Sequence, residues 1–247
     1  MTAGAEKKAA PVGFFDSGVG GRCILSAFRE LCPEEDVVYI ADSSNCPYGS
    51  RPPEEIVRLS EANVEELLAY GCKMVVVACN TATAAAIDHL RSKYPAVPFV
   101  GIEPAVKPAV LNSKSMVVAV LATEGTFNGR LYRETVAKFA AGVTVIAAVA
   151  DEFVTLVERG ETEGPRAESA VSRRIEPLLS AGADHIVLGC THFPHLKKTM
   201  EKVIGGRAVI VDPSVAVAMQ AKRVLAAEGL SAAEIRENGA LVMDIVH

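Results

Sequence analysis

The segment 75–81, VVVACNT, decides the fold of this chain, because a continuous β-branched run ends on a small residue and is followed at once by Cys79. The segment 186–192, IVLGCTH, repeats the pattern in the second half of the chain and leads to Cys190. Short apolar runs of this kind predict buried strands. Since open α/β sheets bind their ligands at the carboxyl ends of strands, each run places a thiol where a ligand site forms.

The rest of the chain alternates short β-branched runs with longer amphipathic segments. This alternation is typical of βαβ units and favours the α/β class with largely parallel sheets. We expect strands at 12–15, 37–40, 74–78, 98–100, 116–121, 143–149, 185–188 and 208–211. The clearest expected helices are 54–70, 128–139, 166–180 and 214–228.

Two matched spacings indicate that the chain consists of two similar halves. Ser17 precedes Cys79 by 62 residues, and Thr126 precedes Cys190 by 64. In each case a hydroxyl-bearing turn after one strand is followed, at nearly the same distance, by a strand that ends on a cysteine. We therefore predict two pseudo-symmetric α/β domains with the active site in the cleft between them. The predicted first domain comprises residues 1–102 and 212–247, and the predicted second domain comprises residues 103–211.

Composition and charge exclude several classes of function. Of the 247 residues, 50% are apolar and the formal net charge is −5, so the chain lacks the basic character that selects nucleic acids or anionic membranes. No apolar run approaches the roughly 20 residues of a membrane-spanning helix, and the first ten residues lack the apolar core of a signal peptide. We expect a cytoplasmic protein with neither a nucleic-acid nor a membrane partner.

The six cysteines follow neither a metal-binding nor a disulfide pattern. No two of them have zinc-finger spacing, and a large, core-rich chain without an export signal is unlike a disulfide scaffold. We therefore expect no metal ion. For Cys79 and Cys190 the alternative to catalysis is burial as small apolar residues. Their equivalent positions in the two halves favour catalysis.

The turn 16–21, DSGVGG, follows the first expected strand and superficially resembles a phosphate-binding glycine loop. It matches neither common phosphate motif, and a carboxylate at its mouth would repel phosphate. Asp16 and Ser17 are better suited to an ammonium group or to assisting a catalytic thiol. The alternative is that one of them simply caps the following helix.

The loop 42–50, DSSNCPYGS, follows the second expected strand and is rich in turn-forming residues. Loops at strand ends often carry binding groups. Here the segment Pro47-Tyr48-Gly49 offers backbone amides and a phenol. An ordinary surface turn explains the spacing equally well.

The residues that follow each cysteine suggest how its thiol is tuned. We expect a helix to begin at each cysteine, where free backbone amides and the helix dipole favour a thiolate and can lower its pKa. The same amides would hold a substrate carboxylate. His192, two residues after Cys190, could protonate or deprotonate a thiol or a substrate. Glu158 interrupts an apolar helical stripe and could orient His192, although a solvated carboxylate at a helix end is a serious alternative.

Taken together, seven motifs resemble those of glutamate racemases, within the cofactor-independent aspartate/glutamate racemase superfamily. They are GFFDSGVGG, ADSSNCPYGS, VVVACNTATAAAI, GIEPAVKPA, VAVLATEGT, FVTLVERG and VLGCTHFPHL, and the resemblance as a whole runs from about residue 12 to residue 217. The resemblance implies interconversion of L- and D-glutamate without a cofactor, with D-glutamate supplied to peptidoglycan. It also implies two pseudo-symmetric domains, a homodimer and a cleft site.

The resemblance further implies roles for individual residues. Cys79 and Cys190 would be the two acid/base thiols, with Asp16 assisting the first and His192 the second, and Glu158 matches a family position. Cys79 would serve D-glutamate and Cys190 L-glutamate. The remaining residues that would hold the amino acid are Ser17, Pro47, Tyr48, Gly49, Asn80, Thr81, Thr123, Thr126 and Thr191.

Racemisation at an α-carbon needs a base on one face and an acid on the other, which two opposed thiols provide. Three alternatives remain open at this point. The substrate is aspartate or another amino acid, because the motifs do not fix pocket length; or the chain is a non-catalytic amino-acid-binding homologue; or the two thiols form a redox-sensing pair. The retention of both cysteines argues against a mere binding protein.

Overall fold

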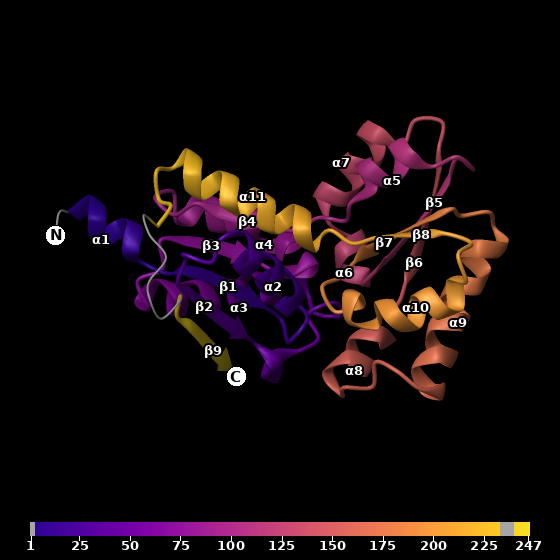
Figure 1. Ribbon diagram of the computed structural model, residues 1–247, viewed down its shortest axis with the longest axis horizontal. Helices are drawn as coiled ribbons and strands as arrows, with labels where there is room; N and C mark the ends of the chain where they lie inside the picture. Colours follow the sequence, from indigo (N-terminus) through magenta and orange to yellow (C-terminus); the bar gives the residue numbers. More distant parts are fainter. Residues whose placement is uncertain (1–2, 233–239) are drawn as a thin grey trace.

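The computed structural model describes residues 3–232 and 240–247 and contains two parallel β-sheets covered by helices (Figure 1). The first sheet has the strand order β4-β3-β1-β2-β9. Its strands are β1 (Val12–Asp16), β2 (Val37–Ala41), β3 (Met74–Val77), β4 (Phe99–Gly101) and β9 (Val242–Val246). The second sheet has the order β6-β5-β7-β8. Its strands are β5 (Val117–Ala122), β6 (Thr144–Val149), β7 (His185–Gly189) and β8 (Val209–Val211). The predicted α/β class with parallel sheets is confirmed.

The strands that lead to the two cysteines occupy the same position in both sheets. Strand β3 pairs with β1, and strand β7 pairs with β5, in each case directly beside a central strand. Strands β3 and β7 are buried along their whole length. Parallel strands buried on both faces read as continuous apolar runs, which is why the segments 75–78 and 186–188 are so uniformly β-branched and aliphatic.

Helices cover both faces of each sheet (Figure 1). Around the first sheet lie α2 (Arg22–Leu31), α3 (Pro53–Ala69), α4 (Asn80–Lys93) and α11 (Ser214–Ala227), and α1 (Ala3–Ala9) lies near the N-terminus. Around the second sheet lie α5 (Val106–Asn112), α6 (Glu124–Phe127), α7 (Arg130–Phe139), α8 (Glu152–Glu158), α9 (Pro165–Ser180) and α10 (Lys197–Ile204). Two short 3₁₀ helices, η1 (Ser43–Asn45) and η2 (Phe193–Leu196), complete the described elements. No helix within the described residues has the length and apolar character to cross a bilayer.

Helix α11 returns to the first sheet after the chain has built the second. It packs against α2, and its buried Ala218, Ala221 and Leu225 join the core that contains β1. The helix begins at Ser214, whose backbone N–H donates to Asp212 Oδ1 at 2.9 Å. This packing accords with assigning residues from 212 onward to the first domain, while the exact boundaries remain a prediction.

Strand β9 is the element that the sequence pattern does not predict. It pairs in parallel with β2 at the edge of the first sheet, and its burial alternates only weakly. An edge strand buries little apolar surface on its free side, so it lacks the continuous apolar run that marks the interior strands. The other strands begin and end within one residue of expectation.

Candidate active site

Cys79 lies at the carboxyl end of β3, where it forms the N-cap of α4. Its Sγ accepts a hydrogen bond from Ala82 N at 3.4 Å and lies 3.6 Å from Ser17 Oγ. Only 4% of the residue is exposed. The thiol is therefore held between a helix N-terminus and the turn that follows β1.

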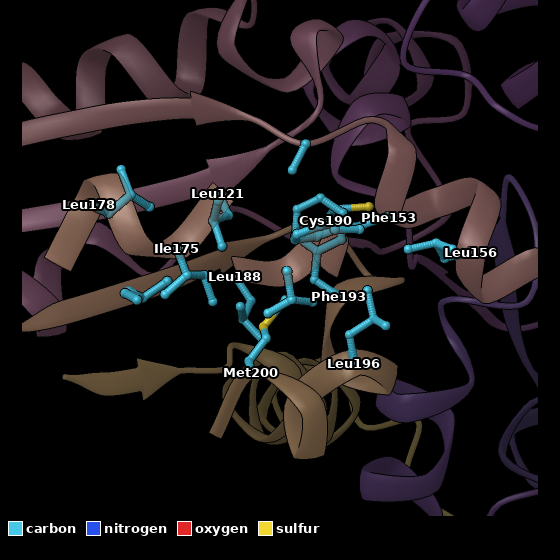
Figure 2. Close-up of a cluster of buried hydrophobic side chains, with 14 of the residues drawn as sticks. Leu121, Phe153, Leu156, Ile175, Leu178, Leu188, Cys190, Phe193, Leu196 and Met200 are labelled. Atoms are coloured by element: carbon cyan, nitrogen blue, oxygen red, sulfur yellow. The ribbon is translucent and has the colours of Figure 1, made fainter. Parts of the chain in front are cut away.

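Cys190 lies at the carboxyl end of β7 and is also buried, with 8% exposure. It borders the apolar core of the second sheet, close to Phe153 and Phe193 (Figure 2). These two rings pack edge to face with centroids 5.3 Å apart. The chain then enters η2 and not an α-helix, so the expectation that an α-helix opens at Cys190 is wrong. The helix dipole is consequently available to Cys79 alone.

Both thiols are more basic than expected from their positions at strand ends. Burial, reinforced by the nearby Asp16 carboxylate, raises the pKa of Cys79 to about 12, although the Ala82 and Ser17 hydrogen bonds oppose the shift. Burial likewise raises the pKa of Cys190 well above its usual value. The expected lowering of the thiol pKa is therefore wrong for the protein without substrate, because desolvation outweighs the amide donors.

Asp16 joins the two halves of the site. It is fully buried at the end of β1, and its Oδ2 accepts the Gly21 N–H at 2.8 Å. The hydroxyl of Thr191, from the opposite half, donates to Asp16 Oδ1 at 3.3 Å. Burial raises the pKa of Asp16, while His192 opposes that shift.

His192 bridges Cys190 and Glu158. Its Nδ1 lies 3.8 Å from Cys190 Sγ, and its Nε2 lies 2.6 Å from Glu158 Oε1. The same carboxylate oxygen accepts the Val19 N–H at 2.9 Å, so a helix of the second half is tied to a turn of the first. Burial tends to raise the pKa of Glu158, but the hydrogen bonds from His192 and Val19 prevail, and its pKa lies below the usual value. Glu158 is therefore ionised at neutral pH.

Gly18 and Gly20 make this close approach possible. A Cβ at Gly18 would lie 2.0 Å from Glu158 Oε1, and a Cβ at Gly20 would lie 2.6 Å from His192 Nδ1. Any side chain at either position would displace the histidine or the carboxylate. Gly18 and Gly20 thus allow the side chains of Glu158 and His192 to approach the backbone of the DSGVGG turn. In a phosphate-binding loop the glycines allow a ligand to approach in the same way.

Threonine hydroxyls and one backbone bond make further contacts between the halves. Thr81 Oγ1 and Thr123 Oγ1 lie 2.9 Å apart, and Thr123 Oγ1 is also 2.9 Å from Thr126 Oγ1. Gly125 N donates to Gly49 O at 3.1 Å. The structure therefore brings the predicted residues of the 42–50 loop, α4 and α6 to one place.

The other loop residues are placed differently from expectation. Pro47 is exposed, and the Tyr48 hydroxyl donates to Asp42 Oδ2 at 2.5 Å and is itself buried in the first domain. Asp42 was not among the predicted site residues, although it directly follows β2, next to the point where Asp16 ends β1. The Tyr48 hydroxyl therefore donates its hydrogen bond to a carboxylate of the protein in this structure.

Asn80 supplies the clearest sign of a ligand. It is 3% exposed, and neither its side-chain oxygen nor its nitrogen has a hydrogen-bond partner. A buried amide without a partner costs free energy, so polar groups in this state call for a ligand or water. Asn80 directly follows Cys79, which places that ligand beside the thiol.

The fold and the site define a class: two parallel α/β units that each present a buried cysteine at a strand end, with an acidic or imidazole partner beside it. The comparisons agree with this class. The family model for Asp/Glu/Hydantoin racemases matches residues 22–221, and the chain belongs to that family.

Three similar proteins illustrate how far the likeness extends. A glutamate racemase of Herpetosiphon aurantiacus is 47% identical over 220 residues, which covers 89% of this chain and 86% of that protein. A glutamate racemase isoform of Bacillus anthracis has a TM-score of 0.84 at 28% identity, covering 97% of this chain and 88% of that one. A glutamate racemase of Francisella tularensis, solved in complex with D-glutamate, has a TM-score of 0.83 at 25% identity, with the same coverages.

Proposed function

We propose that this protein is a glutamate racemase that interconverts L- and D-glutamate by proton transfer between the α-carbon and two thiols. The observation that carries the proposal is the placement of Cys79 and Cys190 at equivalent strand ends of two sheets whose loops contact each other. The names of the relatives, and the D-glutamate in the Francisella tularensis structure, support glutamate as the substrate.

In this mechanism one cysteine acts as a thiolate and removes the α-proton, while the other cysteine donates its thiol proton to the opposite face. The reverse reaction exchanges these roles. The α-carbanion is very unstable, so its carboxylate needs donors that are already in place when charge develops. The Asn80 amide and the hydroxyls of Ser17, Thr81 and Thr191 are suited to this task. Thr123 and Thr126 extend the same hydroxyl cluster.

Each thiol needs help to reach the thiolate form. The raised pKa of Cys79 means that the resting thiol is protonated at neutral pH, so deprotonation must be coupled to substrate binding or to a neighbouring base. We assign that assistance to Asp16 for Cys79 and to His192, held by Glu158, for Cys190. General acid–base assistance of this kind contributes about 10²- to 10⁴-fold per group.

The length of the pocket distinguishes the proposal from its closest alternative, because glutamate and aspartate differ only in side-chain length. The buried carboxylate of Asp16 is a suitable partner for the ammonium group of either substrate. An aspartate racemase would use the same thiols with a shorter pocket. A panel of L-amino acids, followed by circular dichroism, separates the two, because only the preferred substrate loses its optical activity rapidly.

Deuterium exchange tests the proposal directly. Purified protein incubated with L-glutamate in D₂O is expected to place deuterium at the α-carbon, and Cys79→Ala and Cys190→Ala are each expected to abolish racemisation. Cys32→Ala, which removes a buried thiol outside the site, serves as the control. Undiminished turnover in either site variant would exclude the two-thiol mechanism. Glutamate-induced thermal stabilisation without any exchange would instead support a binding protein.

Three further properties belong to the same proposal. From the resemblance of the motifs we infer a homodimer and a role in supplying D-glutamate for peptidoglycan, and from the composition and cysteine usage we infer a cytoplasmic location. Six free cysteines fit a reducing compartment. Light scattering after gel filtration tests the dimer, and D-glutamate auxotrophy after deletion of the gene tests the supply role.

A further inference from the structure

Cys46 is a thiol near the site for which the proposed reaction has no use. It lies in the loop 42–50 and is half-buried, and it packs against the core of the second sheet. Its Sγ, a carboxylate oxygen of Glu158 and a ring nitrogen of His192 all lie within 4.8 Å of one another. Sulfur, carboxylate and imidazole from three separate segments of the chain thus converge on one point.

These three groups match the donor set of a zinc site. Zinc binds thiolate, imidazole and carboxylate, and three protein ligands with one water complete its tetrahedral shell. Ligand atoms in such a shell stand about 3.3 to 3.6 Å apart. The His192–Glu158 contact would have to open from 2.6 Å to that separation, and the other pairs need only side-chain adjustment.

We propose that Cys46, Glu158 and His192 form an inhibitory site for a thiophilic divalent cation such as Zn²⁺. The ion would bind the imidazole nitrogen that now faces Glu158. The inhibitory effect rests on the function proposed above, in which His192 assists Cys190. The Glu158 side chain retains 21% exposure, which leaves a route for the ion from solvent. A neutral imidazole acts as a base by accepting a proton on its unprotonated ring nitrogen. With a metal ion bound to one ring nitrogen, His192 could no longer accept and release that proton, so it would no longer assist Cys190.

An inhibitory ion and a catalytic metal differ in how their removal changes the racemase activity. The two-thiol reaction uses no metal, so chelation is expected to restore activity fully, never to remove it. Zinc also binds accessible thiols in general, and Cys79 and Cys190 are competing targets. A variant of Cys46 therefore decides between the proposed site and a direct attack on the reacting thiols.

The matched variants are Cys46→Ser and Cys23→Ser. Both positions are half-buried, and each substitution replaces a thiol by a hydroxyl, which is a poor zinc ligand. Zinc affinity is measured by competition with a chromophoric chelator, and inhibition is measured as the concentration of ZnCl₂ that halves racemisation. Each variant is compared with its own metal-free rate, and thermal unfolding verifies that it is folded.

Cys46→Ser is expected to weaken both zinc binding and zinc inhibition by at least about tenfold, since even outer partners of metal ligands contribute that much. Cys23→Ser is expected to behave as the unaltered protein. Equal inhibition of Cys46→Ser and the unaltered protein would overturn the proposal and place the zinc on the reacting thiols. Absence of a binding site at micromolar zinc would overturn it as well. The chelator measurement requires no turnover, so it stands even if the protein proves not to racemise glutamate.

A second pair of variants tests the carboxylate ligand independently of Cys46. Glu158→Gln is expected to weaken zinc binding in the chelator assay. Glu152→Gln, on the same helix but paired with Arg174 at the surface, is expected to leave it unchanged. Unaltered zinc binding in Glu158→Gln would remove the carboxylate from the site and contradict the proposed donor set.

Discussion

Replacing Glu158 by Gln keeps the shape of the side chain but removes the charge that faces His192. The carboxylate oxygen lies 2.6 Å from His192 Nε2 and also accepts the Val19 N–H. A hydrogen bond to a charged group contributes about 1.5 to 3 kcal/mol. If the transition state for proton transfer through His192 needs that charge, the substitution raises the barrier by this amount. At about 1.4 kcal/mol per factor of ten, kcat/KM should fall by about 10- to 150-fold.

The assay follows circular dichroism from both L- and D-glutamate. Since the two enantiomers have equal free energies in solution, kcat/KM must fall by the same factor in both directions, which provides an internal check. Glu152→Gln is the control, because Glu152 lies on the same helix and pairs with Arg174 away from the site. A fall of less than about threefold in Glu158→Gln would refute the idea that the carboxylate supports the histidine. Unfolding curves for both variants separate this effect from a loss of stability.

Three further predictions concern other parts of the molecule. Gly18→Ala should lower kcat by about 100-fold while changing stability little. The new Cβ would lie 2.0 Å from Glu158 Oε1, and a displacement of about 1 Å at an active site can reduce the rate by that factor. A rate near that of the unaltered protein would show that the carboxylate tolerates the shift. The buried pair Lys73–Glu35, with an N–O distance of 2.5 Å and exposures of 0% and 1%, should make Lys73→Met less stable by about 3 to 5 kcal/mol in urea unfolding. Adding Glu35→Leu should recover much of that loss, and failure to recover would contradict the isolated-charge explanation. Burial raises the pKa of Cys72 from 9.0 to about 12, so the folded protein keeps a proton that the unfolded chain loses, and stability should decline as pH rises from 9 to 12. Cys72→Ala should show a shallower decline in urea unfolding at pH 8 and pH 10, and parallel declines would exclude this thiol as a contributor.

Much of the fold is predictable because interior parallel strands carry an unmistakable pattern. The continuous runs that lead to Cys79 and Cys190 are buried along their whole length, so their identity as interior parallel strands follows from the sequence. Strand β9 is different, because its pairing with β2 depends on backbone hydrogen bonds and leaves little trace in side-chain pattern. Strand β9 therefore depends on a tertiary contact, its pairing with β2, which is far away in the sequence.

The site is predictable in its residue types but not in its energetics. The pattern identifies both thiols and His192, yet it misjudges their environment, because desolvation depends on everything packed around Cys79 and Cys190. It also leaves open whether Glu158 is a surface carboxylate, since only the folded chain brings α8 against the DSGVGG turn. The contact of Cys46 with Glu158 and His192 joins residues more than 100 positions apart, and no local pattern encodes it.

The central claim is that two different groups exchange protons with opposite faces of the α-carbon. Its most direct test is to follow L-glutamate in D₂O during the first few per cent of conversion and to locate the deuterium by mass spectrometry in each enantiomer separated by chiral chromatography. With two thiols, the D-glutamate formed should carry deuterium from the outset, while the remaining L-glutamate stays protiated. Appearance of protiated D-glutamate, or of deuterium in the unreacted L-glutamate at the same rate, would show that a single group serves both faces and would contradict the account.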